Sequence, residues 1–586
     1  MNNNPYTPLT TDFAEMMDKE IPWNVYPRPQ LKRNSFLCLN GLWDFQVTQS
    51  KDIPKEFKEK ILVPFPVESA LSGIQRTVEK NDRLFYRRTF KLPRRFMRDR
   101  LLLRFGAIDR FAKVYFNGEE MGVHNCGYTP FYVDLTENLQ KGENEIIVEV
   151  RDDLSPNYPY GKQKKKRGGM WYTPVSGIWQ TVWLESVPEN YIENIRIHSY
   201  LDNAEIEVFT KAKHKKITLL DSGEVFESDE EFVTVKPEKI INWTPENPYL
   251  YKFKLETEND TVESYFALRT VTKERVGGIS RLCLNGKPYL FNGLLDQGYF
   301  PDGLFLPATP EGYENDIKLA KSLGFNTLRK HIKIEPPIFY HLCDKLGIAV
   351  FQDMVNNGKY SFIKDTALPT IGLKRKNDRN AHSNPESRES FIECMTATAN
   401  MLYNYPSVVY YTIFNEGWGQ FEADEMFERM KALDNSRIVD ATSGWFHQSK
   451  SDVSSHHVYF KKPIISHEKA KALVLSEFGG FSYRITGHLF GPKNYGYSKH
   501  ETRQSFENAL FTLYEDDVLS LVKIGISALI YTQLSDIEDE TNGLVTYDRK
   551  VVKIDASRMK KICDMLYENH RQTLLTEEEN ENSDLL

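Results

Sequence analysis

The spacing of hydrophobic residues changes along the 586-residue chain, and the first section shows a strand pattern. Over residues 1–186, short apolar or alternating runs follow one another, with turn residues between them. Asn117-Gly118 stands between two such runs and is a strong β-hairpin signal. Many short strands without a helical period predict a jelly-roll β-sandwich for residues 1–186.

A smaller section with the same alternation covers residues 187–272. Half-buried strand patterns occur at 195–200, 205–209 and 253–257. A unit of this size, built from strands alone, predicts an immunoglobulin-like β-sandwich. It carries no candidate chemistry, so we expect it to act as a spacer.

From about residue 273, short apolar runs alternate with helical patterns, which predicts a parallel sheet. We expect strands at 289–295, 326–331, 349–354, 408–415, 438–443, 454–460, 472–477 and 528–534, and helices at 310–323, 335–346, 386–404, 420–433, 499–523 and 555–570. The chain is therefore predicted to be multidomain, β plus α/β, with a C-terminal (β/α)8 TIM barrel over residues 273–574. The acidic residues 575–586 predict a disordered tail.

Charge and hydropathy argue against two classes of partner for this chain. A net charge of −7 without a large basic domain argues against nucleic acid binding. No apolar run is long enough to span a membrane. The dense cationic run at 162–169 is expected to be a solvated loop. We expect neither nucleic acid nor a membrane as a partner, and the sequence leaves a homo-oligomer open.

The cysteines and the first residues of the sequence bear on the cellular compartment in which we expect the protein. Six cysteines are scattered without a Cys-x-x-Cys pair, which argues against a zinc cage and for reduced thiols. The first residues lack the basic and apolar regions of a signal peptide. We therefore expect a cytoplasmic protein without a cofactor.

Two of the predicted barrel strands end in a glutamate. The apolar run 408–414 leads into Asn415-Glu416-Gly417, and the run 472–475 leads into Ser476-Glu477. In one parallel barrel, both carboxylates would lie at the C-terminal rim, where barrel active sites are found. For either residue alone, a structural bond to a neighbouring loop is the commoner explanation. The pair, each in the same setting, favours a glycosidase.

The other predicted strand ends also carry polar groups, which would be costly to bury without partners. From these strand ends we select the candidate substrate-binding residues Asn415, Arg329, His331, Asp296, Tyr459, His457, Trp445 and Gln533. Polar groups with interleaved aromatic rings are what a carbohydrate site requires.

Glycoside hydrolysis gives these residues specific tasks. One carboxylic acid protonates the leaving oxygen, and a second carboxylate attacks the sugar or activates water. The second must be ionised, and Arg329 and Tyr459 are candidate donors to it. Asn415 is a candidate partner for the sugar hydroxyl next to the reacting carbon, where a hydrogen bond strengthens in the transition state.

Several motifs, taken in order, carry a family resemblance. They are Leu39–Phe45, Val63–Ser69, Pro174–Gln180, Gly324–His331, Asn415-Glu416 and Ser476–Gly479. Together they resemble the retaining glycosidases of glycoside hydrolase family 2, which contains β-galactosidases, β-glucuronidases and β-mannosidases. The resemblance implies a carbohydrate substrate, with Glu416 as general acid/base and Glu477 as nucleophile. It also implies that Arg329, His331, Tyr459 and one of His456 and His457 line the sugar subsite.

Departures from the family pattern bear on the substrate. Glucuronidases of this family hold the sugar carboxylate with an Asn-x-Lys near the last barrel strand, and the stretch 540–549 has no lysine at the matching position. The large metal-dependent β-galactosidases carry acidic and histidine ligands where this chain has Asn356-Asn357-Gly358 and Trp171. We therefore expect no metal and no glucuronide, and a β-galactoside is our first expectation.

Other functions remain open at this stage. The glycone could be a β-mannoside, β-glucoside, β-glucuronide or arabinoside. The chain could also be a non-catalytic carbohydrate-binding protein on the same scaffold, or a transglycosylase that shares the first half-reaction.

Overall fold

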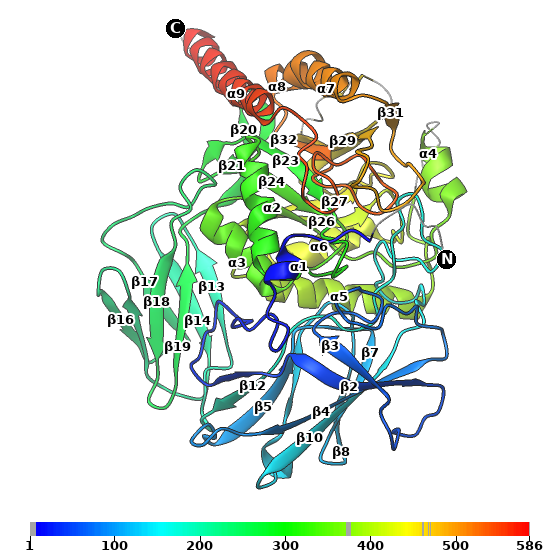
Figure 1. Ribbon diagram of the computed structural model, residues 1–586. Helices are drawn as coiled ribbons and strands as arrows, with labels where there is room; N and C mark the ends of the chain where they lie inside the picture. The colour runs from blue at the N-terminus through cyan, green and yellow to red at the C-terminus, as the bar shows by residue number, and fades with distance from the viewer. Residues whose placement is uncertain are drawn as a thin grey trace.

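The computed structural model describes residues 8–370, 377–459, 462–463, 465–466, 468 and 470–584. Figure 1 shows a barrel in the upper part of the molecule, the N-terminal domain below it and a second β domain to the left. Within the described residues, no helix combines the length and apolar character needed to span a membrane.

The N-terminal domain is a sandwich of antiparallel sheets, as predicted. One sheet has the order β1-β12-β5-β9 and the other β3-β2-β4-β10-β7-β8. The strands are β1 (Phe36–Cys38), β2 (Gly41–Thr48), β3 (Glu59–Val63), β4 (Arg83–Lys91), β5 (Arg100–Phe105), β6 (Ile108–Asp109), β7 (Phe111–Phe116), β8 (Glu119–Asn125), β9 (Phe131–Asp134), β10 (Glu143–Arg151), β11 (Gly177–Ile178) and β12 (Val182–Val187). Asn117 and Gly118 turn the chain between β7 and β8, both at positive φ, which confirms the predicted hairpin.

The second domain is a smaller sandwich with its own hydrophobic core. Its sheets have the orders β13-β14-β17 and β16-β15-β18-β19. The strands are β13 (Asn194–Ser199), β14 (Ala204–Phe209), β15 (Lys215–Leu219), β16 (Val225–Ser228), β17 (Phe232–Val235), β18 (Tyr251–Glu256) and β19 (Thr261–Phe266). A short antiparallel sheet of β20 (Val271–Val276), β21 (Ile279–Leu284) and β22 (Lys287–Pro288) follows, and its apolar residues share a core with the barrel strands.

Eight parallel strands form the barrel, in the order β27-β26-β25-β24-β23-β32-β29-β28. They are β23 (Phe291–Asp296), β24 (Thr327–Lys330), β25 (Ala349–Asp353), β26 (Val408–Asn415), β27 (Ile438–Ser443), β28 (Val453–Val458), β29 (Ala472–Gly479) and β32 (Ala528–Thr532). The two end strands of this series meet where Asp452 N donates to Val439 O at 3.0 Å and Val439 N donates to Asp452 Oδ2 at 2.9 Å. Each of the eight predicted strands overlaps an observed one.

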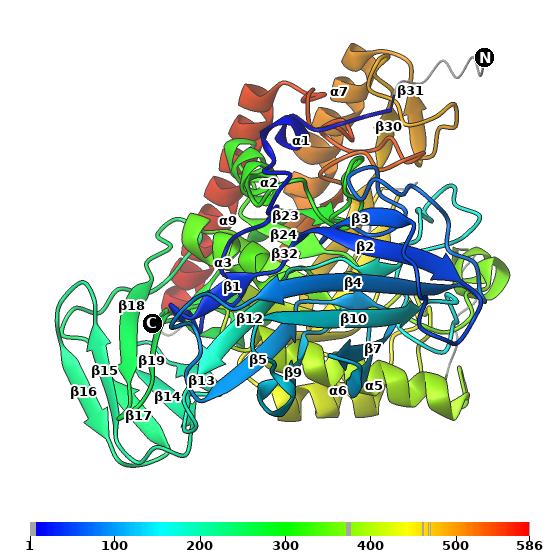
Figure 2. The same ribbon diagram turned by 60° about the horizontal axis from the view of Figure 1, so that its bottom comes forward.

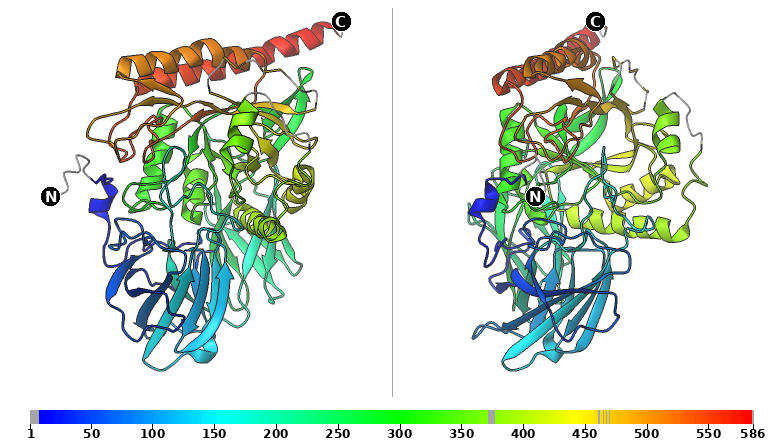
Figure 3. Two further views of the ribbon diagram at one scale, coloured as in Figure 1. Left: turned by 90° about the vertical axis from the view of Figure 1, so that its right-hand side faces the viewer. Right: turned by 45° about the vertical axis from the view of Figure 1, so that its right-hand side comes forward.

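Helices cover the outside of the barrel, and this explains why its strands are apolar on both faces. They are α2 (Glu311–Ser322), α3 (Pro337–Leu346), α5 (Pro385–Leu402), α6 (Ala423–Leu433), α7 (Arg503–Thr512), α8 (Leu519–Lys523) and α9 (Ala556–Asp584). Figure 1 shows α5 between the barrel and the N-terminal domain and α9 beside α8 at the opposite side, and Figures 2 and 3 show the same domains from other sides.

The C-terminal segment corrects one prediction. We expected disorder from residue 575, but α9 continues as a helix to Asp584. The carboxylate of Glu577 accepts hydrogen bonds from Arg281 Nη2 at 2.7 and 2.8 Å. Because the Arg281 side chain is 1% exposed, this ion pair ties the tail helix to β21. Residues 585 and 586 of the predicted tail lie outside the described residues.

Arg269, between the second domain and β20, should be important for stability. Its guanidinium donates to the carbonyl oxygens of Pro406 and Val408 at 3.0 Å and of Ser436 at 3.3 Å. We expect Arg269→Met to destabilise the protein by about 1–3 kcal/mol, because it leaves the buried carbonyl oxygen of Pro406 without its donor. A thermal unfolding scan would show this as a lower midpoint. The exposed Arg571→Met is the control, and equal midpoints for both variants would contradict the expectation.

Candidate active site

Glu416 and Glu477 come from two strands of the barrel and lie at the same end of it. Glu477 belongs to β29, and Glu416 follows the last residue of β26. Glu416 has a positive φ of 54°, and its N–H donates to Ser443 O at 2.9 Å. At Gly417, a Cβ atom would lie 2.0 Å from the ring of Phe446, so only glycine fits the turn after Glu416.

The two carboxylates face each other. One oxygen of Glu416, one oxygen of Glu477 and one ring nitrogen of His457 all lie within 4.8 Å of one another. Carboxyl groups about 5 Å apart allow direct attack on a sugar, whereas mechanisms that place a water between them need roughly 6.5 Å or more. The separation therefore suits a nucleophile and an acid/base.

His457, on β28, connects the two acids. Its Nδ1 lies 2.9 Å from Glu416 Oε1, and its Nε2 lies 3.6 Å from Glu477 Oε1. The same Nε2 is 2.9 Å from the hydroxyl of Ser443. Trp445 packs edge-on against the imidazole, and its indole N–H donates to the backbone oxygen of Glu416 at 2.9 Å.

Glu477 accepts hydrogen bonds on both carboxylate oxygens. Arg329 Nη1 donates to Oε1 at 3.2 Å, and the hydroxyl of Tyr459 donates to Oε2. Burial alone would raise the pKa of Glu477. The charges of two histidines and of the Arg329 guanidinium, together with the Tyr459 hydroxyl, outweigh burial and lower this pKa to about 2. The histidines are His457 and His331.

Arg329 is the centre of a buried polar cluster. It forms a two-pronged ion pair with Asp353, at 2.9 and 3.0 Å, and donates to Asn415 Oδ1 at 2.9 Å. His331 Nδ1 lies 2.7 Å from the same carboxylate of Asp353. Burial lowers the pKa of His331, although its bond to Asp353 opposes the shift. The site thus contains six predicted residues: Asn415, Arg329, His331, Tyr459, His457 and Trp445.

The remaining two predicted substrate residues direct their hydrogen bonds elsewhere. Asp296 accepts from Lys330 Nζ at 2.6 Å and from Gly298 N at 2.8 Å. Gln533 donates to Asn542 Oδ1 at 2.7 Å and accepts from Gln297 at 3.1 Å. These bonds explain how both residues are buried, and their contact with a sugar stays a prediction.

A loop of the N-terminal domain, residues 161–172, reaches the mouth of the barrel, which the sequence did not reveal. Gly161 N donates to Asn356 O at 3.2 Å, just after β25. On the other side, Tyr172 Oη donates to Glu540 Oε2 at 2.5 Å, after β32. Lys162 lies between these contacts and is half-buried, whereas Lys164–Arg167 are exposed. The predicted solvated loop is therefore confirmed only for its tip.

Glu540 is a third carboxylate, and it lies near Glu477. It is buried, and Asn542 Nδ2 donates to its Oε1 at 3.0 Å. Burial raises the pKa of Glu540, and the charge of Glu477 raises it further. The Tyr172 hydroxyl, the ammonium of Lys162 and Asn542 lower it. Its position in a loop, without a strand-end pattern, gave no sequence signal.

Stacked tyrosines connect the surroundings of Glu477 to the segment that carries Glu540. The ring of Tyr459 stacks on Tyr497 with centroids 3.8 Å apart. Tyr495, two residues earlier, bonds through its backbone to Asp539 at 2.8 Å and Thr541 at 3.1 Å. Tyr495 and Tyr497 belong to the loop 480–499, which therefore forms part of the site.

Comparisons with known proteins agree with this architecture. Residues 53–188 match the description "Glycosyl hydrolases family 2, sugar binding domain", and residues 277–476 match "Glycosyl hydrolases family 2, TIM barrel domain". A β-galactosidase of Thermoanaerobacter pseudethanolicus is 29% identical over 46% of this chain and 39% of its own length. One from Actinobacillus pleuropneumoniae is 25% identical over 72% of this chain and 46% of its own length. The chain thus spans less than half the length of these two relatives.

A solved structure supports the same fold. The β-D-glucuronidase of Dictyoglomus thermophilum aligns with a TM-score of 0.70 at 19% identity, covering 92% of this chain and 98% of that one. At this identity the likeness shows the fold and not the substrate. Because two domain types of one family match in order over more than half of the residues, the chain belongs to glycoside hydrolase family 2.

Proposed function

We propose that this chain is an exo-acting retaining β-glycosidase that removes a terminal, uncharged β-linked sugar, with a β-galactoside as the first candidate. The observation that carries the proposal is the short distance between Glu416 and Glu477. One carboxylate oxygen of Glu416 lies within 4.8 Å of one carboxylate oxygen of Glu477. This spacing suits double displacement, because the nucleophile must reach the sugar without an intervening water.

In the first step, a carboxylate oxygen of Glu477 attacks the anomeric carbon while the glycosidic bond breaks. Glu416 gives its proton to the departing oxygen, so an alcohol leaves and a glycosyl ester remains on Glu477. In the second step, Glu416 takes a proton from water, and the resulting oxygen attacks the anomeric carbon. The ester bond breaks, the sugar leaves with its original anomeric configuration, and both glutamates return to their starting states.

The polar cluster around Glu477 prepares it for this attack. Arg329 and Tyr459 hold the carboxylate ionised and fix its orientation, and this lowers the entropy cost of reaching the attack geometry. Asn415 is itself fixed by Arg329 at 2.9 Å, which leaves its amide nitrogen to bond a sugar hydroxyl. Such preorganised donors are most effective where charge develops in the transition state.

An uncharged glycone is supported by the charges at the barrel mouth. Lys162 and Glu540 act on each other electrostatically, so the ammonium is balanced by a carboxylate. A uronate would add its negative charge beside Glu477 and Glu540, and the stretch 540–549 offers no compensating lysine at the family position. Hydroxyl groups, in contrast, can both donate to Glu540 and accept from Lys162.

Removing the nucleophile tests the central assignment. On a panel of nitrophenyl β-galactoside, β-glucoside, β-mannoside, β-glucuronide and α-arabinoside, we expect the wild type to prefer the galactoside. Glu477→Gln should lower kcat by about 10⁴-fold or more, because an amide cannot form the glycosyl ester. The exposed Glu501→Gln is the matched control and should keep full activity. A Glu477→Gln variant of near-wild-type rate, or a first product of inverted configuration by NMR, would refute the mechanism.

Tyr459→Phe should change the pH dependence. The Tyr459 hydroxyl lowers the pKa of Glu477, so its loss raises that pKa from about 2 and moves the acid limb of kcat/KM to higher pH. We also expect kcat to fall about 10–100-fold. The control is Tyr514→Phe, which removes another buried hydroxyl that has no hydrogen-bond partner in the described part of the chain. Identical pH–rate profiles for wild type and Tyr459→Phe would rule out this role.

Two substitutions test the choice of an uncharged glycone. Lys162→Met should lower kcat/KM for the neutral glycoside about 10–100-fold, because Glu540 then lies beside Glu477 without a balancing cation. Glu540→Gln should raise the ratio of glucuronide to galactoside hydrolysis about tenfold, because it removes repulsion and frees Lys162. Lys166→Met, at the exposed tip of the loop 161–172, serves as control. Unchanged selectivity in both variants would disprove the role of the pair.

A further inference from the structure

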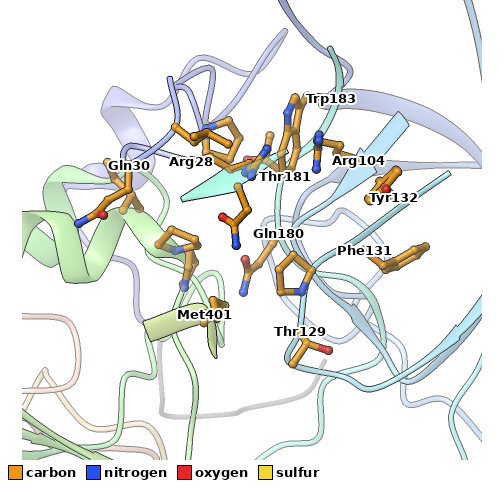
Figure 4. A pocket seen from close by; sticks show the side chains of 18 of the residues that line it. Arg28, Gln30, Arg104, Thr129, Phe131, Tyr132, Gln180, Thr181, Trp183 and Met401 are labelled. Carbon is orange, nitrogen blue, oxygen red and sulfur yellow. The ribbon is translucent and has the colours of Figure 1, made fainter. Parts of the chain in front are cut away.

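A second cavity lies where the three domains meet, away from the two glutamates. It has a volume of about 550 Å³ and is lined by β5, β9, β12 and β13 and by the barrel helices α3 and α5. Figure 4 shows residues of the N-terminal domain on one side of it and Met401 of α5 on another. None of the residues that form the candidate active site lines this cavity.

Gln180 is a buried amide without a partner in this cavity. Its residue is only 4% exposed, and Figure 4 shows the side chain directed into the open space. Among the described residues, no hydrogen bond to the Gln180 amide is formed. The amide thus offers one donor and one acceptor to the cavity, and a ligand that supplies both can bond it.

The charged groups of the cavity wall neutralise one another. Arg104 Nε lies 2.8 Å from Glu185 Oε2, and Arg28 Nη1 lies 3.7 Å from the same oxygen. Glu185 is fully buried, so its charge is held within the wall. The exposed Glu193 offsets the remaining cation at the rim. An anionic or cationic ligand would gain little here, and an uncharged one is favoured.

Aromatic rings supply apolar surface beside these polar groups. Trp183 and Tyr132 line the cavity, and Tyr132 is 48% exposed. Amide and hydroxyl groups accompany them, among them Gln180 and Thr181. Apolar walls with a few convergent polar groups are typical of small-molecule sites, and sugar rings present both an apolar face and hydroxyl groups.

We propose that this interdomain cavity is a second, non-catalytic binding site for a neutral saccharide of a few sugar rings. Hydroxyl groups of the saccharide would bond the free amide of Gln180, and the apolar faces of its sugar rings would lie against Trp183 and Tyr132. Because the cavity is shared by three domains, an occupant would contact all of them and stabilise their arrangement. The proposal does not depend on the catalytic assignment, since it shares no residue with that site.

The test uses the full chain carrying Glu477→Gln, so that no probe is consumed. Calorimetric titration and thermal unfolding with cellobiose, β-1,4-galactobiose, β-1,4-mannobiose and xylobiose should reveal a second binding event for at least one probe. Gln180→Leu and Tyr132→Ala, added separately, should each weaken that event at least tenfold and leave the first event unchanged. Tyr200→Ala replaces another tyrosine, 44% exposed and outside the cavity, and is the matched control.

Activity measurements separate this site from the catalytic one. In an otherwise wild-type chain, Gln180→Leu and Tyr132→Ala should keep kcat and KM for the preferred nitrophenyl glycoside within twofold. Tyr132 is exposed, so its replacement tests binding even if Gln180→Leu does not fold. A single binding event with every probe, or a second event that both variants retain at full strength, would overturn the proposal and leave a cavity that holds only water.

Discussion

The candidate active site depends on one buried guanidinium. Arg329 on β24 bonds Asp353 on β25, Asn415 on β26, and both the backbone oxygen of Ser476 and the carboxylate of Glu477 on β29. A buried cation is stabilised only when it is paired and hydrogen-bonded in good geometry. The need to satisfy Arg329 therefore fixes three side chains and one backbone oxygen on three other strands, and the position of Glu477 follows from it.

The N-terminal domain completes the mouth of the barrel. Gly161 has a positive φ of 63°, and a Cβ atom there would lie 2.9 Å from the backbone oxygen of Ile332. Only glycine lets the loop 161–172 come so close to the barrel backbone, and this contact brings Lys162 to the barrel. The hydrogen bond from Tyr172 to Glu540 joins the other end of the loop 161–172 to the segment after β32. The sandwich is thus part of the candidate site, and its removal would expose polar groups that it now covers.

The pattern of apolar residues in the sequence predicted the barrel strands and the polar residues at their ends. The barrel strands are apolar on both faces, so their ends were visible as the points where Asn415-Glu416 and Glu477 begin. Contacts across domains have no such signal: the run containing Lys162 has the composition of a solvated loop, and only the fold places it at the barrel. The tail was misjudged for a similar reason, because the partner that holds Glu577 is a buried arginine almost 300 residues away. Asp296 lies at a strand end as expected, but the neighbouring Lys330 takes up its charge.

The surroundings of the two glutamates differ in a way that supports their proposed roles. The side chain of Glu477 is 5% exposed, and Arg329 and Tyr459 bond its two oxygens. Such a carboxylate stays ionised and in one orientation, as a nucleophile requires. The side chain of Glu416 is 16% exposed, and one of its oxygens lies 2.9 Å from His457 Nδ1. An acid/base must exchange a proton in every cycle, so a carboxylate with access to water fits that role, whereas the carboxylate bonded on both oxygens does not.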